Sequence, residues 1–443
     1  MNVGLLGIGT VGSGTFSVLA RNRDEITRRA GRAIAITMVA DKDVAKARAL
    51  VAERTIAGEP AATVVDDAFA VVRHPDIDIV VELIGGYGIA KDLILEAIAR
   101  GKHVVTANKA LLALHGNEIF AAAQKQGVMV AFEAAVGGGI PIIKALREGL
   151  TANRIEWIAG VINGTSNFIL SEMRDKGLAF DTVLAEAQRL GYAEADPTFD
   201  IEGIDAGHKL TIMSAIAFGV PMQFEHAYTE GITKLTAEDI RYAEELGYRI
   251  KLLGITRRVG EGKSAGIELR VHPTLIPARR LIANVEGVMN AVLVKGDAVG
   301  QTMYYGAGAG AEPTASAVVA DLVDITRLAT VDPENRVPHL AFQPDRISDL
   351  PILPMDDIET AYYLRMRVQD KPGVLADITR ILADLTISIV AMVQKAPAAG
   401  ESEADIILLT HRTIERNMNG AIVKIEALAT VSGKVTRLRL EAL

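Results

Sequence analysis

An acid-rich segment that ends in a lysine has the clearest potential for chemistry in this sequence. Residues 190–209 read LGYAEADPTFDIEGIDAGHK, with carboxyl groups at Glu194, Asp196, Asp200, Glu202 and Asp205 and an amine at Lys209. Four positions separate Asp205 from Lys209, so the two side chains share a face if the segment is helical. Carboxylates can hold the amino group of a ligand, and a lysine whose pKa is lowered by its surroundings can move a proton.

The same residues also have simpler interpretations. From spacing alone, the more common one for Asp205 and Lys209 is a surface ion pair worth roughly a few tenths of a kcal/mol. Glu194 and Asp200 would usually be solvated loop residues, and His208 a bystander. The segment by itself does not decide between a loop and a pocket.

A second lysine lies where an open α/β sheet places its ligands. Lys109, in VVTANKALL, follows a β-branched run at the carboxyl end of a predicted strand. The chain has no cysteine, which removes thiolate chemistry, and none of its eight histidines has metal-ligand spacing. Hydride transfer to or from a carbonyl needs a proton on its oxygen, and a positioned acid or base contributes about 10²–10⁴-fold to such a step. Lysine is therefore the candidate proton carrier.

The N-terminal stretch LLGIGTVGSG predicts a dinucleotide-binding loop. Gly7, Gly9 and Gly12 stand in G-x-G-x-x-G order, directly after a predicted strand and at the start of a predicted helix. They would allow the tight turn, the approach of backbone to a pyrophosphate and the packing of helix on strand. The helix N-terminus would offer amide donors to the phosphates. The residues predicted to line this loop are Gly7, Ile8, Gly9, Thr10, Val11 and Gly12.

The ends of the next strands would contact the rest of the cofactor. Asp41 stands where an acid accepts the adenine-ribose hydroxyls of NAD, whereas Lys42 could meet the 2′-phosphate of NADP, so both cofactors stay open. A helix-start acid followed by a solvated lysine is the simpler alternative. Gly85 in ELIGG would let the nicotinamide half pass closely, and Thr106 ends the following strand beside it.

The elements that must position these residues suggest three domains. Apolar strands without strict alternation are interleaved with helices over the first 130 residues, which predicts a Rossmann-type, doubly wound parallel sheet. Glycine-rich loops then mark an α+β substrate-binding and dimerisation domain. Five of the fifteen prolines fall between Pro333 and Pro354, which predicts an extended linker. A strand-helix-strand-strand-helix-strand order follows and indicates a ferredoxin-like domain. The predicted boundaries are 1–132 plus 315–332, then 133–314, the linker 333–360, and 361–443.

Composition limits the class of partner. The chain has 443 residues, 49% of them hydrophobic and 23% charged, with a net charge of −8. This acidic balance argues against nucleic acid or an acidic membrane as a partner. The sequence contains no basic leader and no apolar run of about 18 residues, so we expect a cytoplasmic protein.

Beyond these patterns, the sequence shows a family resemblance. GYAEADPTFDIEGIDAGHK resembles the G-Y-x-E-x-D-P…D…G-x-D-x-x-x-K signature of homoserine dehydrogenases. TANKALL, EAAVGGGIPII, GVINGTSNFIL and YYGAGAGAEPTASAV also look like that family and follow its order, over about residues 1–330. The C-terminal part, with DKPGVLADIT at its first strand–helix turn, looks like an ACT domain, as in three-domain bacterial members of the family.

The resemblance implies an NAD(P)-dependent oxidoreductase that interconverts L-homoserine and L-aspartate 4-semialdehyde, on the route to threonine, methionine and isoleucine. By this resemblance Lys209 exchanges a proton with the substrate oxygen, Asp205 belongs to the same catalytic group, and Lys109 is a second lysine near cofactor and substrate. The other residues that it implies are Glu194 and Asp200, with Asp205, at the substrate and Gly191 and Gly310 at the cofactor.

The resemblance also implies a cation and an effector. EAAVGGGI would hold Na⁺ or K⁺ near the active site, because hard cations take oxygen ligands, although a flexible hinge would look the same. The ligands would be Glu133 with the backbone of Val136, Gly138 and Ile140. The ACT turn at Gly373 and Val374 would present amides to an amino-acid carboxylate, with L-threonine as the expected inhibitor. A purely dimerising domain fits the residues equally well, and we expect a two-fold homodimer or homotetramer.

Two other functions were weighed against this one. A phosphorylating semialdehyde dehydrogenase works through a cysteine thioester, and this chain has no cysteine. A non-catalytic amino-acid sensor built from ACT and Rossmann domains has no need for the set Glu194, Asp205 and Lys209 beside an intact glycine loop. The sensor is kept as the alternative.

Overall fold

Two compact units make up the computed structural model of the chain, which describes residues 1–55, 60–395, 397 and 402–443. The first unit comprises residues 1–164, 205–225 and 288–350, and the second comprises 165–204, 226–287 and 351–443. These units divide the chain differently from the predicted domains, because part of the predicted middle segment falls in each unit. The predicted boundaries thus remain a prediction.

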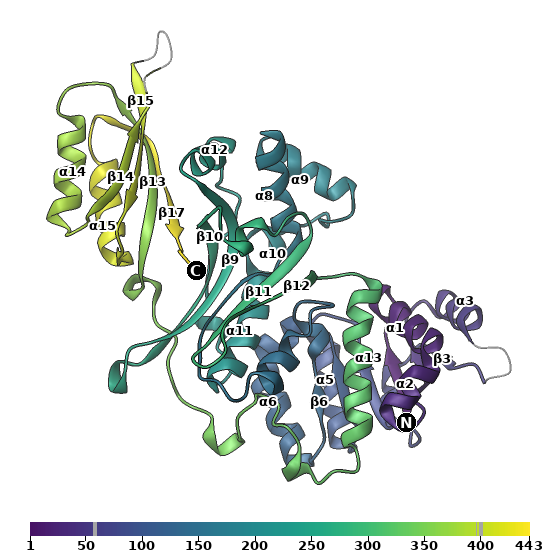
Figure 1. The fold of residues 1–443 in the computed structure, drawn as a ribbon. Coiled ribbons are helices and arrows are strands. Elements are labelled where there is room, and N and C mark those ends of the chain that lie inside the picture. Colours follow the sequence, from purple (N-terminus) through teal and green to yellow (C-terminus); the bar gives the residue numbers. More distant parts are fainter. Residues whose placement is uncertain (56–59, 396, 398–401) are drawn as a thin grey trace. The chain divides into compact units, whose positions relative to one another are not determined.

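A six-stranded parallel sheet forms the centre of the first unit, with the strand order β3-β2-β1-β4-β5-β6 (Figure 1). Its strands are β1 (Asn2–Leu6), β2 (Ala35–Ala40), β3 (Thr63–Val65), β4 (Ile79–Glu82), β5 (His103–Thr106) and β6 (Val130–Ala131). The order in which successive strands are added to the sheet reverses between β1 and β4, and this is the switch point where such sheets bind dinucleotides. The predicted Rossmann-type sheet is confirmed.

Helices cover both faces of this sheet. They are α1 (Thr10–Arg21), α2 (Arg23–Ala30), α3 (Val44–Arg54), α4 (Ala68–Arg73), α5 (Gly88–Ala99), α6 (Lys109–Gln126) and α13 (Ala311–Leu328). One apolar core joins the strands to α1, α2, α3 and α13, and it contains fully buried side chains such as Leu5, Val39 and Leu322. Although α13 comes late in the chain, it lies beside α1 and α2 (Figure 1). Packing on α13 therefore fixes the helix that follows the glycine loop.

Two local features of this sheet do not follow from the sequence pattern. The segment after the glycine loop forms two helices, α1 and α2, which are separated by Asn22, and α2 ends at Gly31, whose φ of 78° forms the left-handed cap. Asn22 has φ −107° and ψ 19°, outside the helical region. Strand β3 was not predicted, since three residues are too few to show a periodic pattern.

The rest of the first unit carries three antiparallel strands and a buried helix. β11 (Met289–Gly296) pairs with β7 (Ile155–Val161) on one side and with β12 (Gly300–Ala307) on the other. Helix α11 (Ile204–Phe218) is buried along its whole length from Asp205 onward. The connection from the parallel sheet to β7 passes through η1 (Glu133–Ala135), α7 (Ile142–Lys144) and the π-helical turn η2 (Ala145–Gly149).

The proline-rich segment is not a loose linker. As predicted, it lacks regular helix and sheet, with only the short 3-10 turns η6 (Pro333–Asn335), η7 (Pro344–Arg346) and η8 (Met355–Asp357). However, the Nε2 atom of His339 accepts the Val130 N–H at 3.1 Å, and the Ser348 N–H donates to the Gly219 carbonyl at 2.7 Å. The imidazole of His339 also stacks on Phe120. These hydrogen bonds join the proline-rich segment to the rest of the first unit, although the segment has no regular helix or sheet.

Helices and a long antiparallel pair form the first part of the second unit. The helices are α8 (Gly164–Lys176), α9 (Phe180–Arg189), α10 (Thr198–Ile201) and α12 (Ala237–Glu245), with the 3-10 turns η4 (Gly262–Ser264) and η5 (Leu281–Asn284). Strands β9 (Tyr248–Val259) and β10 (Gly266–Pro277) pair in full antiparallel register, and the two-residue β8 (Tyr228–Thr229) adds to β10.

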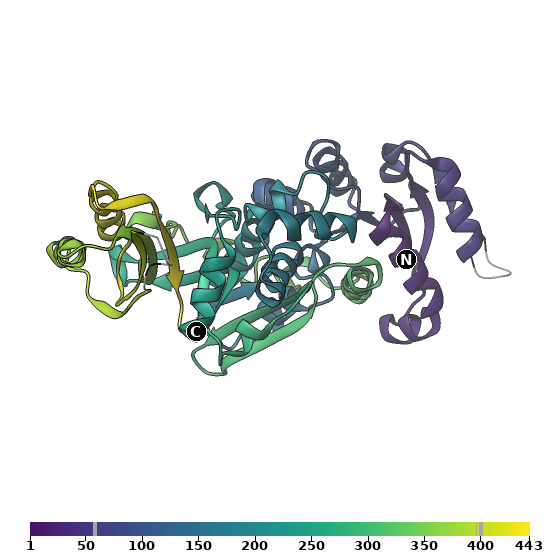
Figure 2. The same cartoon turned by 90° about the horizontal axis from the view of Figure 1, so that it is seen from above.

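The C-terminal part of the second unit has the predicted ferredoxin-like order. It runs through β13 (Glu359–Gln369), α14 (Val374–Asp384), β14 (Ile389–Gln394), β15 (Glu403–Thr410), β16 (Thr413–Ile414), α15 (Glu415–Glu426) and β17 (Val431–Leu440). The main strands form an antiparallel sheet in the order β17-β13-β15-β14, and both helices lie on the same face of it (Figure 2). An apolar core of Tyr362, Ile378, Leu408 and Met418 joins sheet and helices.

Buried charges connect this C-terminal sheet to β10. Strand β17 pairs in parallel with the end of β10, and Arg270 on β10 donates to Glu441 at 2.6 Å and to Glu268 at 3.0 Å. All three side chains are at most 4% exposed. Burial of charge is tolerated here because every charged group has a partner. In the described part of the chain no helix is long and apolar enough to cross a membrane.

We predict that Gly14→Ala destabilises the first unit. A Cβ at Gly14 would lie 2.5 Å from the Ala311 carbonyl oxygen, where α1 meets α13. Overpacking of this kind costs about 1–3 kcal/mol, which should outweigh the gain of about 1 kcal/mol from alanine in a helix. Calorimetric unfolding of the cofactor-free protein measures the effect. Gly9→Ala is the control, since its Cβ would have no neighbour within 4 Å. Equal melting temperatures for the two variants would show that the α1–α13 contact is not tight.

Candidate active site

A buried carboxylate shared by two lysines is the centre of the site. The Nζ of Lys209 lies 2.7 Å from Oδ2 of Asp205, and the Nζ of Lys109 lies 3.1 Å from Oδ1 of the same residue. The side chains of Asp205 and Lys209 are 6% and 10% exposed, and that of Lys109 is 31% exposed. The interpretation of Asp205 and Lys209 as a surface ion pair is therefore wrong, and the pair sits inside the first unit.

Three elements bring these groups together. Helix α11 carries Asp205 and Lys209 one turn apart, as the four-residue spacing predicts. Lys109 is the first residue of α6, directly after β5, and the side chain of Asn108 caps that helix by accepting the Leu111 N–H. The chain after β7 supplies Asn163, whose Nδ2 donates to Asp205 at 2.8 Å. The carboxyl end of the parallel sheet thus contributes to the site through Lys109.

Asp205 stays ionised in this setting. Burial on its own would raise the pKa of Asp205, but the charges of Lys209 and Lys109 and the hydrogen bonds from Lys209 and Asn163 hold it well below its ordinary value. The neighbouring His208 is different, because burial lowers its pKa to about 4 and its imidazole is neutral at neutral pH. A cationic His208 is therefore not the acid of this site.

Among the described residues, two of the three ammonium hydrogens of Lys209 have a partner. Its ammonium has three hydrogens, and two of them are directed at Asp205 and at the Ile162 carbonyl, 2.8 Å away. Both contacts fix the direction of the third hydrogen. An ammonium held this way can donate to a hydroxyl or carbonyl oxygen, and the amine that remains after proton loss can take the proton back.

The glycine loop has the geometry that a pyrophosphate needs. Gly7 has φ 90° and donates its N–H to the Ala40 carbonyl at 2.8 Å, and a Cβ at Gly12 would lie 2.1 Å from the Gly7 carbonyl oxygen. By contrast, a Cβ at Gly9 would meet nothing within 4 Å, so the open side of the loop faces away from the protein. Gly9 precedes α1 with no side-chain cap, which leaves the amides of Thr10, Val11 and Gly12 for an anion. The residues present fit a dinucleotide.

Asp41 lies beside this loop but is already engaged. Its Oδ2 accepts the Ile8 N–H at 2.8 Å, and its Oδ1 accepts the Asp43 N–H at 2.9 Å. Lys42 is exposed. Farther along the sheet edge, Gly85 has φ 80° and open space at its Cβ position. Gly310, with φ 127°, precedes α13.

The predicted cation loop is ordered by Glu133. Its carboxylate accepts the N–H groups of Ile143 and Lys144 at 2.9 and 2.8 Å, and burial raises its pKa to about 7 in spite of these bonds. Each carboxylate oxygen accepts one N–H group and keeps a further lone pair, so Glu133 can still bind a cation in this loop. Gly138, with φ 55°, packs against Gly308 so closely that a Cβ would clash. No cluster of three or more His, Asp or Glu side chains suited to a metal occurs in the described residues.

Three of the predicted residues lie in the second unit. Gly191, with φ 76°, and Glu194 are exposed in the turn that follows α9, and Asp200 is in α10. This turn is tied to α8, because Thr165 donates its hydroxyl to the Tyr192 carbonyl at 2.6 Å and Ser166 donates to the Asp200 carbonyl at 2.9 Å. The structure brings together Lys109, Asp205 and Lys209; the roles of Gly191, Glu194 and Asp200 remain predictions.

Comparison with known proteins agrees with this geometry over the whole chain. The homoserine dehydrogenase family matches residues 141–323, the NAD-binding domain of homoserine dehydrogenase matches residues 7–133, and the ACT domain matches residues 362–429. The homoserine dehydrogenase of Pseudomonas aeruginosa is 61% identical over 443 residues, covering 100% of this chain and 99% of the relative. The chain belongs to the homoserine dehydrogenase family. It is an NAD(P)-dependent oxidoreductase that acts on a CH–OH group and carries an ACT domain.

Solved structures support the same assignment. A homoserine dehydrogenase from Thiobacillus denitrificans is 71% identical, with a TM-score of 0.93 and coverage of 100% of this chain and 98% of that one. A hyperthermophilic archaeal homoserine dehydrogenase mutant in complex with NADPH has a TM-score of 0.60 at 26% identity, covering 75% of this chain and 98% of that one.

Sequence reasoning missed a buried carboxylate at the nicotinamide end of the family's cofactor domain. Glu82 is fully buried, and its Oε1 accepts the N–H groups of Ile84 and Gly85 at 2.9 and 3.0 Å. Its Oε2 accepts a hydrogen bond from the Thr106 hydroxyl at 2.8 Å. The hydroxyl oxygen of Thr106 in turn accepts the Asn108 N–H at 3.0 Å. Asn108 also donates to the Gly86 carbonyl at 2.5 Å. Glu82 thus fixes the glycine turn and the residue that caps the helix of Lys109.

Asn163 and Ile162 were also missed as site residues. Both lie in the stretch GVINGTSNF, where the sequence shows only that a polar pair interrupts an apolar run. A charged residue that ends a strand of three apolar residues, as in IVVE, was the available signal for Glu82. Buried carboxylates at strand ends are rare enough to deserve a functional interpretation.

We predict that Thr106→Val impairs turnover by releasing Lys109. Valine keeps the shape but removes the hydroxyl that joins Glu82 to Asn108, and leaving such buried groups without partners costs about 1–3 kcal/mol. The specificity constant for the alcohol should fall about tenfold or more, while Thr106→Ser should retain it.

Thr326→Val is the matched control, because this buried threonine donates only within α13. Steady-state kinetics and fluorescence titration of the cofactor measure the effect. If Thr106→Val and Thr326→Val behave alike, Glu82 does not position Lys109.

Proposed function

We propose that the chain interconverts L-homoserine and L-aspartate 4-semialdehyde with NAD or NADP, as part of threonine, methionine and isoleucine biosynthesis. The observation that carries the proposal is the carboxylate of Asp205 shared by Lys209 and Lys109. This arrangement supplies an oriented proton donor on a rigid helix, beside a sheet edge suited to a nicotinamide. We also propose that the protein acts in the cytoplasm.

In this mechanism Lys209 manages the proton of the substrate oxygen. The free hydrogen of its ammonium donates to the carbonyl oxygen of the semialdehyde, and in the other direction its amine accepts the hydroxyl proton of homoserine. The nicotinamide, when bound, supplies or accepts the hydride. Asp205 remains ionised throughout and stabilises Lys209 in its charged form. The Ile162 carbonyl keeps the lysine oriented while its charge changes.

The remaining carboxylates suit the amino group of the substrate. We propose that Glu194 and Asp200, with Asp205, bind the ammonium of homoserine, and that Gly191 and Gly310 contact the cofactor. Support comes from the positive φ of both glycines and from the ordered turn that holds Glu194 and Asp200. Since the substrate is a zwitterion, a carboxylate set that binds its ammonium also selects against simple alcohols.

Cofactor choice and the cation complete the proposed site. Asp41, placed at the ribose end, would repel the 2′-phosphate of NADP, and exposed Lys42 would attract it, so both cofactors are proposed as substrates. We propose that Na⁺ or K⁺ binds Glu133 together with the main-chain carbonyls of Val136, Gly138 and Ile140. The two amides that hold the Glu133 carboxylate in place support this proposal.

We propose that the ACT domain binds L-threonine as a feedback inhibitor in a two-fold homodimer or homotetramer. Gly373, with φ 96°, precedes α14 without a side-chain cap; the Val374 N–H donates to the Lys371 carbonyl at 3.5 Å, and the amides of Leu375 and Ala376 in the first turn are proposed to bind a carboxylate. The alternative, a non-catalytic amino-acid sensor, would bind threonine without turnover. The proton-donor geometry of Lys209 favours the enzyme.

We predict that Lys209→Met abolishes most turnover and leaves cofactor binding intact. Loss of a positioned proton carrier should lower kcat for homoserine by about 10²–10⁴-fold. The rate is followed at the nicotinamide absorption band, and the cofactor dissociation constant by fluorescence. Lys125→Met, which removes an exposed lysine at the other end of the helix of Lys109, is the control and should keep full activity. Normal turnover in Lys209→Met would exclude this mechanism.

Threonine should inhibit the enzyme through the turn at Gly373. Alanine at this positive φ is disfavoured by about 1–2 kcal/mol, so Gly373→Ala should distort the amide-bearing turn without a steric clash. Inhibition by L-threonine should weaken while the uninhibited rate stays unchanged. Gly433→Ala, at another positive-φ glycine of the same domain, is the matched control. Equal threonine inhibition in both variants would place the effector elsewhere.

A further inference from the structure

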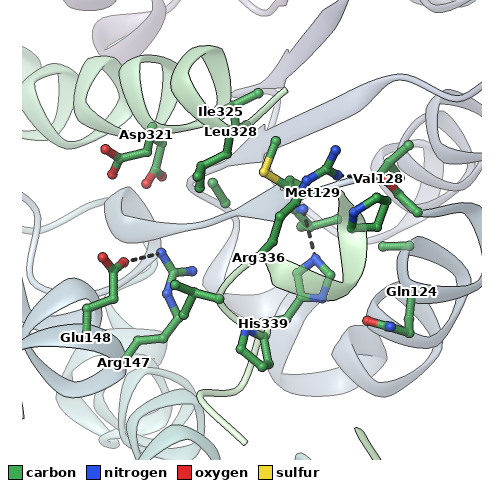
Figure 3. A pocket seen from close by; sticks show the side chains of 18 of the residues that line it. Gln124, Val128, Met129, Arg147, Glu148, Asp321, Ile325, Leu328, Arg336 and His339 are labelled. Atoms are coloured by element: carbon green, nitrogen blue, oxygen red, sulfur yellow. Dashed lines mark hydrogen bonds and ion pairs between the residues drawn. The ribbon is translucent and has the colours of Figure 1, made fainter. Parts of the chain in front are cut away.

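A cavity of about 370 Å³ lies inside the first unit, lined by parts of the proline-rich segment. Its walls come from the end of α6 with β6, from the π-helical turn η2, from α13, and from residues 333–344. Figure 3 shows Arg147 and Glu148 at one side, Asp321, Ile325 and Leu328 on α13, and Arg336 and His339 from the proline-rich segment. None of the residues of the proposed catalytic site lines it. The volume is in the range of small-molecule sites.

One cationic group in this cavity has unused hydrogen-bonding capacity. Arg147 donates from Nη2 to Glu148 at 3.1 Å, whereas its Nε is buried and has no hydrogen-bond partner in the described chain. A guanidinium presents Nε and Nη together in a fork that matches a carboxylate. Arg147 belongs to the π-helical turn, and such turns frequently occur at functional sites.

The other cationic groups of the cavity are already used. The ammonium of Lys144 is paired with Asp324. Arg336 donates to the carbonyls of Gly127, Ala329 and Val331, at 2.9, 3.3 and 3.0 Å. Arg336 thus holds the proline-rich segment to the ends of α6 and α13. Arg327, which also lines the cavity, donates to the Arg29 carbonyl at 2.9 Å and to Asp324 at 3.4 Å. Among the described lining residues, Arg147 is thus the cation with a buried nitrogen that has no partner, which suits a monoanion and not a phosphate dianion, because Glu148, Asp321 and Asp324 line the same space.

The remaining wall is apolar. Val128, Met129, Ile325 and Leu328 line it, and they come from the sheet side and from α13 (Figure 3). An apolar wall next to a single guanidinium is complementary to a molecule with one charged end and a short hydrocarbon chain. Burial of a few methylene groups would add affinity at about 0.8 kcal/mol each.

We propose that this cavity binds a small aliphatic carboxylate. A carboxylate oxygen accepts from the guanidinium of Arg147, and the hydrocarbon chain lies against Met129, Ile325 and Leu328. Because residues 333–344 form part of the wall, an occupied cavity holds the segment that leads to the C-terminal domain. The site is separate from the glycine loop and from Lys209, and it binds without cofactor.

Calorimetric titration of the full chain with butyrate, in a carboxylate-free buffer without cofactor, tests the proposal. Saturable binding is expected, with no binding of butyramide, which has the same shape and no charge. Arg147→Met should weaken butyrate binding at least about tenfold, and Arg154→Met, which removes an exposed arginine of the same unit, should leave it unchanged. A second variant, Gln124→Trp, lies at the exposed rim and should also weaken butyrate binding. Because it does not disturb the interior, it tests the proposal even if Arg147→Met fails to fold.

Several results would overturn the proposal. Absence of saturable butyrate binding would do so, as would equal binding of butyrate and butyramide. Unchanged affinity in a folded Arg147→Met, or in Gln124→Trp, would place the ligand elsewhere. Inorganic phosphate that binds more tightly than butyrate would show that the cavity selects charge and not an aliphatic chain. Turnover is not needed as a readout, so the result is independent of the proposed reaction.

Discussion

The shared carboxylate of Asp205 is the contact on which the rest of the site depends. A single buried anion would be costly, and so would two buried lysines, but together with Asn163 they satisfy one another. The three elements that meet there come from distant parts of the chain. Helix α11 supplies the pair, the β5–α6 turn supplies Lys109, and the end of β7 supplies Asn163. Removing Asp205 would leave Lys209 in the interior without its counter-charge, so this carboxylate organises the fold as well as the chemistry.

A second buried carboxylate, Glu82, extends this organisation to the cofactor side. It accepts from the glycine turn after β4 and from Thr106 after β5, so neighbouring strand ends are joined through one side chain. Thr106 and Asn108 carry that order on to the cap of α6, whose first residue is Lys109. The Glu82 network and the cluster of Lys109, Asp205 and Lys209 therefore meet at the start of α6, where Asn108 directly precedes Lys109.

Features encoded by short-range pattern were predictable, and features that depend on tertiary contact were not. The glycine loop, the Rossmann-type sheet and the ferredoxin-like order follow from residue spacing and periodicity, and the structure has them. The pairing of Asp205 with Lys209 follows from spacing, but its burial does not, since helical periodicity cannot show what covers α11. Glu82 and Asn163 escaped because their partners lie 24 and 42 positions away. The break at Asn22 and the strand β3 each involve three residues or fewer, which is too short a stretch to show a periodic pattern in the sequence.

The proline-rich segment shows why composition misleads about flexibility. Prolines prevent helix and sheet, but Arg336, His339 and Ser348 fix the chain by hydrogen bonds within the first unit. On the other side of Leu350, the Ile267 N–H donates to the Pro351 carbonyl at 2.9 Å and the Leu353 N–H to the Ile267 carbonyl at 2.8 Å, within the second unit. The chain is thus anchored up to the point where one unit ends and from the point where the other begins. The segment that leads to the C-terminal sheet is therefore not loose. Strand β17 of that sheet is also joined to β10, by strand pairing and by the ion pair of Arg270 with Glu441. The ACT part is therefore held to the rest of the second unit both by the segment that leads to it and by strand β17.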